Sequence, residues 1–217
     1  MTTEERYLHI LDWFMENMPN AQTELNYSNP FELLVAVILS AQCTDKRVNM
    51  VTPQLFSDFP TPEAMASTTP EKLLEYIRSV SYPNSKAKHL VEMSRKLVAD
   101  FEGKVPDNVD KLQTLPGVGR KTANIIVSVI YNQPAMPVDT HVFRVSERLG
   151  LTTDSKNPLQ TERELVRHIP PQLLPIAHHW LILHGRYVCH ARKPKCNVCG
   201  LKSWCRYYFN HSLEQDI

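Results

Sequence analysis

Apolar residues recur along nearly the whole chain at the three- and four-residue spacing of an amphipathic α-helix. One face of residues 4–18, for example, carries Leu8, Leu11, Phe14, Met15 and Met18. No stretch sustains the two-residue alternation of a half-buried strand, and the six glycines and sixteen prolines suit many short helices. This spacing predicts an all-α fold.

Several helix starts are marked by a capping residue that is followed by proline and glutamate. In the segment NPFE, Asn29 can cap the helix, Pro30 suits its first turn and Glu32 can reach back as in a capping box. Residues 61–63 and 69–71, both TPE, repeat the pattern. The helix after Asn29, FELLVAVILSAQ, is apolar all round, so we expect it at the buried centre of a bundle.

Later helices are predicted from the same spacing, near residues 85–103, 107–114, 120–131, 140–149, 161–169 and 172–188. Asn84 can cap the first of them, from Ser85, and Gly150 can end the fourth in a left-handed conformation. Internal repeats of solenoid type and low-complexity linkers are absent from the sequence.

The length and the N-terminus limit where such a protein acts. A chain of 217 residues can form one large domain or two small ones. No segment approaches the roughly 18–20 continuous apolar residues of a membrane helix. The first residues, MTTEERYLHI, are acidic and periodic, unlike a signal peptide. We therefore expect a cytoplasmic protein with no membrane contact, associated with the nucleoid if it is bacterial.

Charge is distributed unevenly, although the net charge is only +1. The segments 111–138 and 174–213 contain no acid at all. Their basic residues are Lys111, Arg120, Lys121, Arg186, Arg192, Lys193, Lys195, Lys202 and Arg206. On charge alone, a one-sided surface for nucleic acid and chance clustering on solvated faces are equally good interpretations.

The segment LPGVGRKT, residues 115–122, separates two of the expected helices. Its two glycines can adopt positive φ and let another surface approach closely. The next helix begins at once, so its first N–H groups and its positive dipole end form an anion site. The alternative is a tight turn without a ligand. The residues expected to contact a DNA backbone here are Gly117, Val118, Gly119, Arg120 and Thr122.

Lys121 and Asp139 are the candidate catalytic residues. Lys121 lies in the first turn of its helix, where the dipole, the adjacent Arg120 and any partial burial disfavour the ammonium form. Only the free amine can attack carbon. Asp139 precedes the helix THVFRVSERL and would cap it. Judged alone, each has an ordinary interpretation, as a solvated or phosphate-binding lysine and as a plain N-cap.

Four cysteines lie within seventeen residues, with the spacing Cys-x6-Cys-x2-Cys-x5-Cys. They are Cys189, Cys196, Cys199 and Cys205. A four-cysteine zinc site more often has two short knuckles, whereas a [4Fe–4S] cluster has a larger core that spans wider gaps. Iron–sulfur is therefore favoured over zinc, with a disulfide or unliganded thiols as the remaining alternative.

The loop between the first two of these cysteines is strongly basic. Its cationic side chains, Arg192, Lys193 and Lys195, are candidates for phosphate contacts. The fifth cysteine, Cys43, has no partner in this pattern, and we expect it to be a small core residue.

Together, these features resemble the endonuclease III family of iron–sulfur helix-hairpin-helix DNA glycosylases. The matching stretches are LLVAVILSAQCTD (33–45), LPGVGRKTAN (115–124), VDTHVFRV (138–145), HHWLILHGRYVC (178–189) and the four-cysteine tail. The resemblance covers the whole chain in the same order, and the combination is specific where a lone hairpin is not.

The resemblance implies a two-lobed all-α architecture. Residues 23–133 would form a six-helix barrel bearing the hairpin. Residues 1–22 and 134–217 would form a discontinuous domain carrying one [4Fe–4S] cluster, with double-stranded DNA between the two. The implied activity is that of a bifunctional glycosylase and abasic-site lyase of base excision repair. Its substrates would be damaged pyrimidines, which we expect to be oxidised. We expect such an enzyme to act as a monomer.

The family pattern also assigns roles to individual residues. Lys121 would attack C1′ of the damaged nucleotide, form a Schiff base and cut the strand 3′ to the lesion by β-elimination, with Asp139 assisting. Gln42 would fill the gap left by the extruded base. Asp45 and His141 are candidates for the base pocket. The four cysteines of the tail would hold the cluster.

One segment departs from the family. Where the family usually has Gly-Leu-Tyr, with a leucine that wedges into the opposite strand, this chain has Ser81-Tyr82-Pro83. Tyr82 falls at the wedge position, and an aromatic ring can still intercalate. We therefore hypothesise that Tyr82 is the wedge.

Two alternatives remain at this point. A monofunctional adenine or mismatch glycosylase of the same superfamily would share the cysteine spacing and the aspartate, but it usually lacks this lysine and carries an extra C-terminal domain, which we do not expect here. A non-catalytic DNA-binding protein with a structural zinc would be colourless and would cut no strand.

Overall fold

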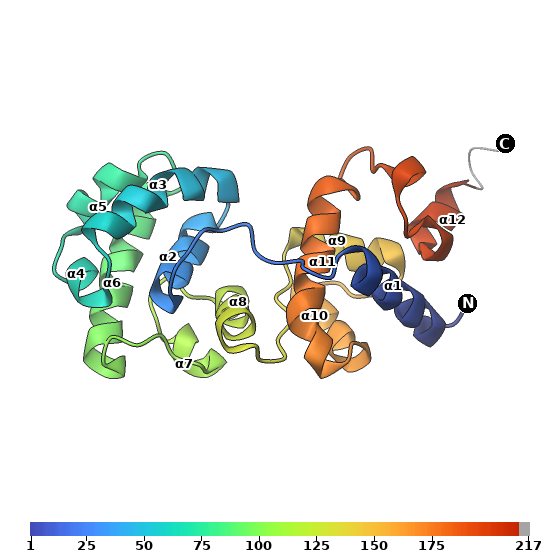
Figure 1. Ribbon diagram of the computed structural model, residues 1–217, viewed down its shortest axis with the longest axis horizontal. Helices are drawn as coiled ribbons and strands as arrows, with labels where there is room; N and C mark the ends of the chain where they lie inside the picture. The colour runs from blue at the N-terminus through green and yellow to red at the C-terminus, as the bar shows by residue number, and fades with distance from the viewer. Residues whose placement is uncertain (213–217) are drawn as a thin grey trace. The chain divides into compact units, whose positions relative to one another are not determined.

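The computed structural model describes residues 1–212, and all the regular structure within that range is helical (Figure 1). The all-α prediction is therefore confirmed. The chain divides into two compact units. One is the continuous segment Glu24–Asn132, and the other combines Met1–Thr23 with the chain from Gln133 onward.

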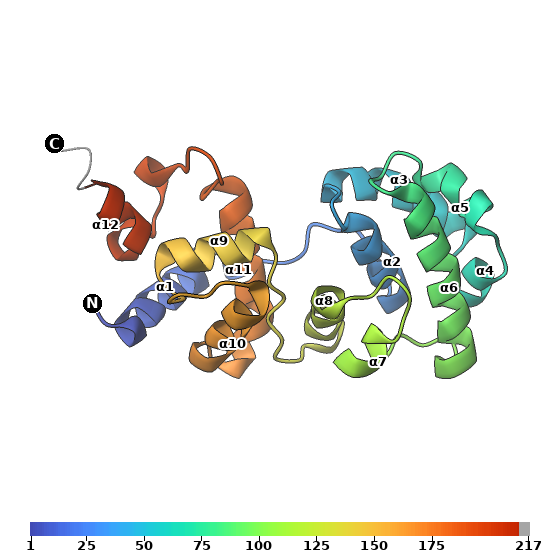
Figure 2. The ribbon, with the colours of Figure 1, turned by 180° about the vertical axis from the view of Figure 1, so that it is seen from behind.

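The Glu24–Asn132 unit is built around one apolar helix. Its helices are α2 (Pro30–Ser40), α3 (Asp45–Asp58), α4 (Pro62–Ala66), α5 (Pro70–Ile77), α6 (Pro83–Phe101), α7 (Val109–Gln113) and α8 (Arg120–Tyr131). Eight of the nine residues of α2 from Phe31 to Leu39 are buried, and Glu32 is the exception. The helix packs against α3, α6 and α8, and it lies among them in both Figure 1 and Figure 2. Its expected place at the centre of the bundle is confirmed.

The helix starts expected from capping residues are present in this unit. The Asn29 side chain accepts a hydrogen bond from the Glu32 amide at 3.0 Å, and Thr61 and Thr69 cap α4 and α5 in the same way. In a capping box, the Glu32 carboxylate would accept from the Asn29 amide. It instead accepts from the Ser28 amide, one residue earlier in the chain. These caps fix where each helix begins.

The start of α6 differs from the prediction. The helix begins at Pro83, so Asn84 lies inside its first turn and the expected Asn84 cap was wrong. Tyr82 occupies the N-cap position with a left-handed φ of 54° and makes no side-chain cap. Proline is favoured at the first helical position, and it disfavours the right-handed helical conformation for the residue before it. Both effects place the boundary between Tyr82 and Pro83.

Two further helices differ from expectation. Helix α3 was not predicted, because its buried residues Val48, Thr52 and Leu55 form a stripe interrupted by a polar residue, and Pro53 resembles a helix breaker. Helix α10 begins at Pro158 rather than near Thr161, with Asn157 as its cap.

The second unit joins both ends of the chain. Its elements are α1 (Thr3–Asn17), α9 (Thr140–Leu149), α10 (Pro158–His168), the 3₁₀ turn η1 (Pro171–Leu173), α11 (Leu174–Tyr187), the 3₁₀ turns η2 (Cys196–Val198) and η3 (Lys202–Trp204), and α12 (Arg206–Ser212). Phe14 of α1 stacks on Trp180 of α11, with ring centroids 5.5 Å apart. The Trp180 indole donates to the Met18 carbonyl, and the Tyr7 hydroxyl to the Leu151 carbonyl. Buried aromatic groups with satisfied polar atoms therefore hold α1 to this unit.

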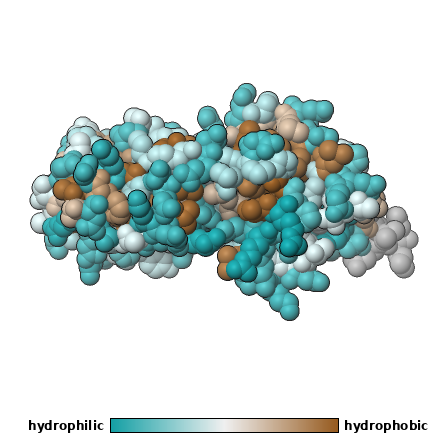
Figure 3. Space-filling view, turned by 90° about the horizontal axis from the view of Figure 1, so that it is seen from below, coloured by the Kyte–Doolittle hydropathy of each residue, from teal (hydrophilic) through white to brown (hydrophobic). Residues whose placement is uncertain are grey.

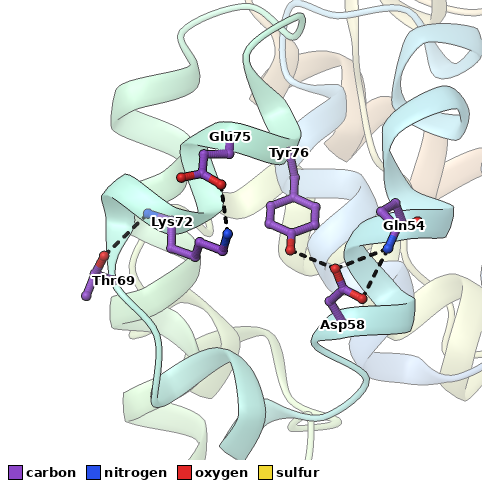
Figure 4. A network of polar contacts seen from close by, with 6 residues as sticks. All are labelled: Gln54, Asp58, Thr69, Lys72, Glu75 and Tyr76. Carbon is purple, nitrogen blue, oxygen red and sulfur yellow. Dashed lines mark hydrogen bonds and ion pairs between the residues drawn. The ribbon is translucent and has the colours of Figure 1, made fainter.

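A polar network joins α3 to α5 at the surface of the first unit (Figure 4). The Tyr76 hydroxyl donates to Asp58 at 2.7 Å, and the Gln54 amide donates to both carboxylate oxygens at 3.1 Å. These hydrogen bonds hold the pKa of the Asp58 carboxyl below its ordinary value, and the bond from Tyr76 has the largest effect. The neighbouring Lys72–Glu75 ion pair is solvent-exposed, so it contributes little to stability.

The molecular surface is mixed in character. In the view of Figure 3, hydrophobic side chains gather in patches that hydrophilic ones interrupt. Among residues 1–212, no helix is both long and apolar enough to cross a membrane.

Replacing the cap of the central helix tests this account of the fold. We expect Asn29→Ala to lower the free energy of unfolding by about 1 kcal/mol, because the Glu32 amide loses its partner. Ser85→Ala, in the exposed first turn of α6, is the matched control and should change it by less than about 0.5 kcal/mol. Urea denaturation followed by circular dichroism measures both, and equal effects would contradict the capping role of Asn29.

Candidate active site and metal centre

The hairpin connects α7 to α8 through residues 114–119. Gly117 has a φ of 79°, and a side chain there would meet His89 at 3.0 Å, so two constraints require glycine. Gly119 is extended rather than left-handed and is the N-cap of α8. A Cβ added at Gly119 meets no atom within 4 Å, so this side of the hairpin is open for close approach. Val118 is buried, and its amide donates to the Leu115 carbonyl at 3.1 Å, so the structure does not present it to a ligand as Gly119 is presented.

Lys121 lies in the first turn of α8, as the sequence predicts. Its side chain is exposed, as is that of Arg120, whereas Thr122 is half-buried. The partial burial considered for Lys121 is thus not present in this unit.

Asp139 is the N-cap of α9 in the second unit, again as predicted. A single carboxylate oxygen, Oδ1, accepts from the amides of His141 and Val142, both at 2.8 Å. These bonds fix the orientation of the carboxylate. His141 itself is half-buried, and its Nδ1 lies 3.2 Å from the Arg144 guanidinium.

Gln42 and Tyr82 come from turns that adjoin each other in the first unit. Both have a left-handed φ of 54°, which is unfavourable for residues other than glycine. The Ser81 hydroxyl donates to the Gln42 carbonyl at 2.6 Å and so joins the two turns. Both side chains are exposed, and 63 % of Tyr82 is accessible. Asp45 lies three residues beyond Gln42, at the first position of α3.

The four cysteines of the tail gather at one place. Cys189 follows α11, Cys196 begins η2, and Cys199 and Cys205 end η2 and η3. All are free thiols, and each lies close enough to feel the charge of others in the set. Burial raises the pKa of Cys199 to about 11. Because a buried thiol resists ionising, thiolates here need a metal to stabilise them.

The four cysteines are neighbours, and their side chains are the ligands that both metals considered would use. Within the described residues, no three Cys, His, Asp or Glu side chains are arranged to hold a single metal ion. The choice between metals rests on the spacing: only the gap between Cys196 and Cys199 is as short as a zinc knuckle, and wider gaps suit the larger core of an iron–sulfur cluster.

Comparison with known proteins agrees with this arrangement. Residues 35–171 match the HhH-GPD superfamily of base excision DNA repair proteins, and residues 189–205 match the iron–sulfur binding domain of endonuclease III. Endonuclease III of Rickettsia conorii is 49 % identical over 93 % of this chain and 95 % of its own length. The chain belongs to the endonuclease III family.

Two further relatives extend the match. Endonuclease III of Escherichia coli K12 is 44 % identical over 92 % of this chain and 94 % of its own length. The solved structure of a trapped covalent intermediate of endonuclease III with DNA superimposes with a TM-score of 0.92, at 42 % identity, over 98 % of this chain and 100 % of that one. Membership of the endonuclease III family also gives the cofactor, which is a [4Fe–4S] cluster.

Two arginines of α9 support the cysteine site of this family member, and sequence reasoning missed them. Arg148 donates to the Cys189 sulfur at 3.5 Å and to the His190 and Ala191 carbonyls. Arg144 donates to the Cys189 and Gly185 carbonyls. Their four-residue spacing on the helix that Asp139 caps was the available signal.

These contacts also hold the base of the loop that carries the predicted phosphate contacts. Arg192, Lys193 and Lys195 are all exposed there. Cys43, by contrast, is only half-buried, so its predicted place in the core was wrong.

Removing one thiol tests the proposed ligand set. We expect Cys199→Ala to lose most of its bound iron and the visible absorption of the cluster, and to weaken the packing of η2 and η3, because metal binding is coupled to folding. Cys43→Ala is the matched control, since Cys43 lies in the other unit. Iron analysis and absorbance spectroscopy measure the outcome. Full iron content in Cys199→Ala would exclude it as a ligand.

Proposed function

We propose that this chain is a bifunctional DNA glycosylase and abasic-site lyase of base excision repair. Its substrate is double-stranded DNA that contains a damaged pyrimidine, expected to be oxidised, or an abasic site. The observation that carries the proposal is Lys121 in the first turn after the hairpin, in a chain 42 % identical to an endonuclease III that was trapped covalently on DNA. Family membership supports the same activity.

The hairpin and the lysine have separate tasks in this proposal. The open backbone at Gly119 and the positive end of α8 bind a phosphate, with Arg120 and Thr122 beside it. Lys121 is the nucleophile. The exposed cations of the 190–195 loop add contacts to the backbone, which raise affinity for any sequence.

The reaction begins with extrusion of the damaged nucleotide, which costs a few kcal/mol of stacking and pairing. Gln42 enters the gap that remains. The Lys121 amine then attacks C1′, the bond from C1′ to the base breaks, and the base leaves with a proton. Opening of the sugar ring gives an iminium between C1′ and the lysine nitrogen. A proton acceptor then removes a C2′ proton, and the 3′ phosphate oxygen departs, which completes the β-elimination.

Asp139 supports the reaction as an anion that its two amide hydrogen bonds hold in place. A fixed carboxylate stabilises positive charge that develops on the sugar, and it can also accept a proton. Asp45 of the first unit and His141 of the second are each proposed as a contact for the extruded base. Neither contributes to the nucleophile.

The two compact units correspond to two parts of the proposed enzyme. The Glu24–Asn132 unit supplies the hairpin, Gln42 and Lys121, and the second unit supplies Asp139 and the cluster ligands. The cluster serves as a structural support for its loop in this proposal. We place the enzyme in the cytoplasm, on the nucleoid.

Covalent trapping tests the nucleophile. With borohydride, the wild-type protein should form an adduct with a duplex that carries an abasic site, and Lys121→Gln should form none, because borohydride reduces only the Schiff base. Lys104→Gln removes another exposed lysine of the same unit and should keep the adduct. Base release without any adduct in the wild type would favour a monofunctional glycosylase instead.

Tyr82 is proposed to wedge into the strand opposite the lesion. Its exposed ring stands at a turn that is bonded to the Gln42 turn, so the two side chains can act on one distorted site. Stacking of an aromatic ring on a base contributes about 1–3 kcal/mol, which is comparable with the cost of unstacking one step.

Loss of the ring tests this role. Tyr82→Ala should weaken binding to lesion-containing duplex by about tenfold, because one stacked contact is lost. Tyr27→Ala removes another exposed tyrosine of the same unit and should leave affinity unchanged. Electrophoretic mobility shift at fixed salt measures both. Wild-type affinity and turnover in Tyr82→Ala would refute the wedge.

A further inference from the structure

Lys86 is a basic side chain buried in the Glu24–Asn132 unit. It lies in the first turn of α6, and only 5 % of it is accessible to solvent. Lysine is almost never buried to this extent unless its charge has partners. The residues that follow along the same face of α6, Ala87, Leu90 and Val91, are buried apolar side chains.

The partners of Lys86 are backbone carbonyl groups at the end of α2. Its Nζ donates to the Leu39 carbonyl at 2.8 Å and to the Ala41 carbonyl at 2.6 Å. The last carbonyls of a helix lack partners within the helix and carry its negative dipole end, so a cation is favoured there. Burial lowers the pKa of Lys86, and the nearby Cys43 acts in the opposite direction.

The same residue contacts both turns that carry the proposed DNA-inserting side chains. The carbonyl held by the Lys86 ammonium belongs to Ala41, which immediately precedes Gln42. The backbone amide at position 86 donates to the Tyr82 carbonyl at 3.1 Å, which is the first hydrogen bond of α6 and does not depend on the side chain. Between these two contacts, the Ser81 hydroxyl joins the turns directly. Left-handed residues such as Gln42 and Tyr82 persist only where the surrounding structure holds them.

We infer that Lys86 is a positioning residue for DNA distortion, which holds the Gln42 and Tyr82 turns in the conformation that enters the duplex at a lesion. This inference rests on the proposed function. It does not place Lys86 in contact with DNA or with the reacting atoms. Its effect is exerted through two turns whose side chains fill space that opens only when a base leaves the stack.

Lys86→Met tests the inference, because methionine keeps an unbranched apolar chain but removes the charge and the donors. Two duplexes serve as probes. One contains a thymine glycol, so the enzyme must extrude a base. The other contains a preformed abasic site, so there is no base to extrude. We expect the single-turnover rate of adduct formation to fall about tenfold on the first and less than about twofold on the second. A merely structural role would lower both rates alike, and that result would overturn the inference.

A double mutant provides an independent measure. In the Gln42→Ala background, Lys86→Met should cost less than about twofold further on the thymine glycol duplex, because the turn that it positions has already lost its inserting side chain. If the double mutant instead lost rate by the product of the two separate effects, the inference would be overturned. Lys88→Met, on the exposed side of the same helix with 66 % of its side chain accessible, is the matched control and should behave as wild type.

Hydrogen exchange measures the same effect without activity. Amides of residues 41–43 and of Ser81 and Tyr82 should exchange faster in Lys86→Met than in Lys88→Met, and equal exchange would overturn the inference. If Lys86→Met does not fold, Ser81→Ala decides, since it removes only the hydroxyl that joins the turns. It should slow the thymine glycol reaction about threefold and leave the abasic reaction unchanged. Wild-type rates and exchange in Ser81→Ala would overturn the inference.

The failure of the proposed function would have a different signature. Absence of any adduct from the wild-type protein on both duplexes would remove the lyase proposal, whatever Lys86 does. Exchange at the two turns would then still report whether Lys86 holds them.

Discussion

The burial of α2 is the constraint on which the Glu24–Asn132 unit depends. A helix that is apolar on all sides must be covered on all sides, and α3, α6 and α8 pack against it. Such burial takes the Leu39 carbonyl, near the end of α2, away from water, where an unpaired group would cost about 1–3 kcal/mol. Lys86 donates to this carbonyl and to that of the exposed Ala41. The chain can then leave the core at Gln42, so the same packing that stabilises the unit also determines where that side chain meets solvent.

The exposure of Lys121 depends on its place along α8. Ala123, Ile126 and Val127 are buried apolar residues of α8, and Asn124 and Ser128 are buried as well. At 3.6 residues per turn, Asn124 and Ser128 lie on the same side of the helix as Lys121, so this side becomes buried farther along α8. Lys121 is exposed because it lies in the first turn, where Gly119 leaves the approach open. The position of the proposed nucleophile at the end of α8, rather than on one face of it, keeps the amine accessible.

Much of this could be predicted from the sequence, because the signals are local. Helical spacing, the Asn29, Thr61 and Asp139 caps, and the lysine after the hairpin depend on residues within one or two turns of each other. Features that arise from tertiary contacts could not be predicted in this way. Lys86 is an unremarkable lysine in sequence, and only packing against α2 gives it carbonyl partners. The left-handed Tyr82 likewise requires both Pro83 and the neighbouring Gln42 turn.

At the cysteine site, too, the sequence pattern indicates the residues, but tertiary contacts hold them in place. The spacing of the four thiols indicates the ligands, but η2 and η3 are three-residue turns that cannot be stable alone. Their support comes from distant segments. Arg148 of α9 holds Cys189 and the loop beyond it, and the Trp13 ring of α1 packs so closely on Gly200 that no side chain fits there. Because the N-terminal helix braces turns that lie near the other end of the chain, it belongs to the unit with the cysteines, and that unit is discontinuous in sequence.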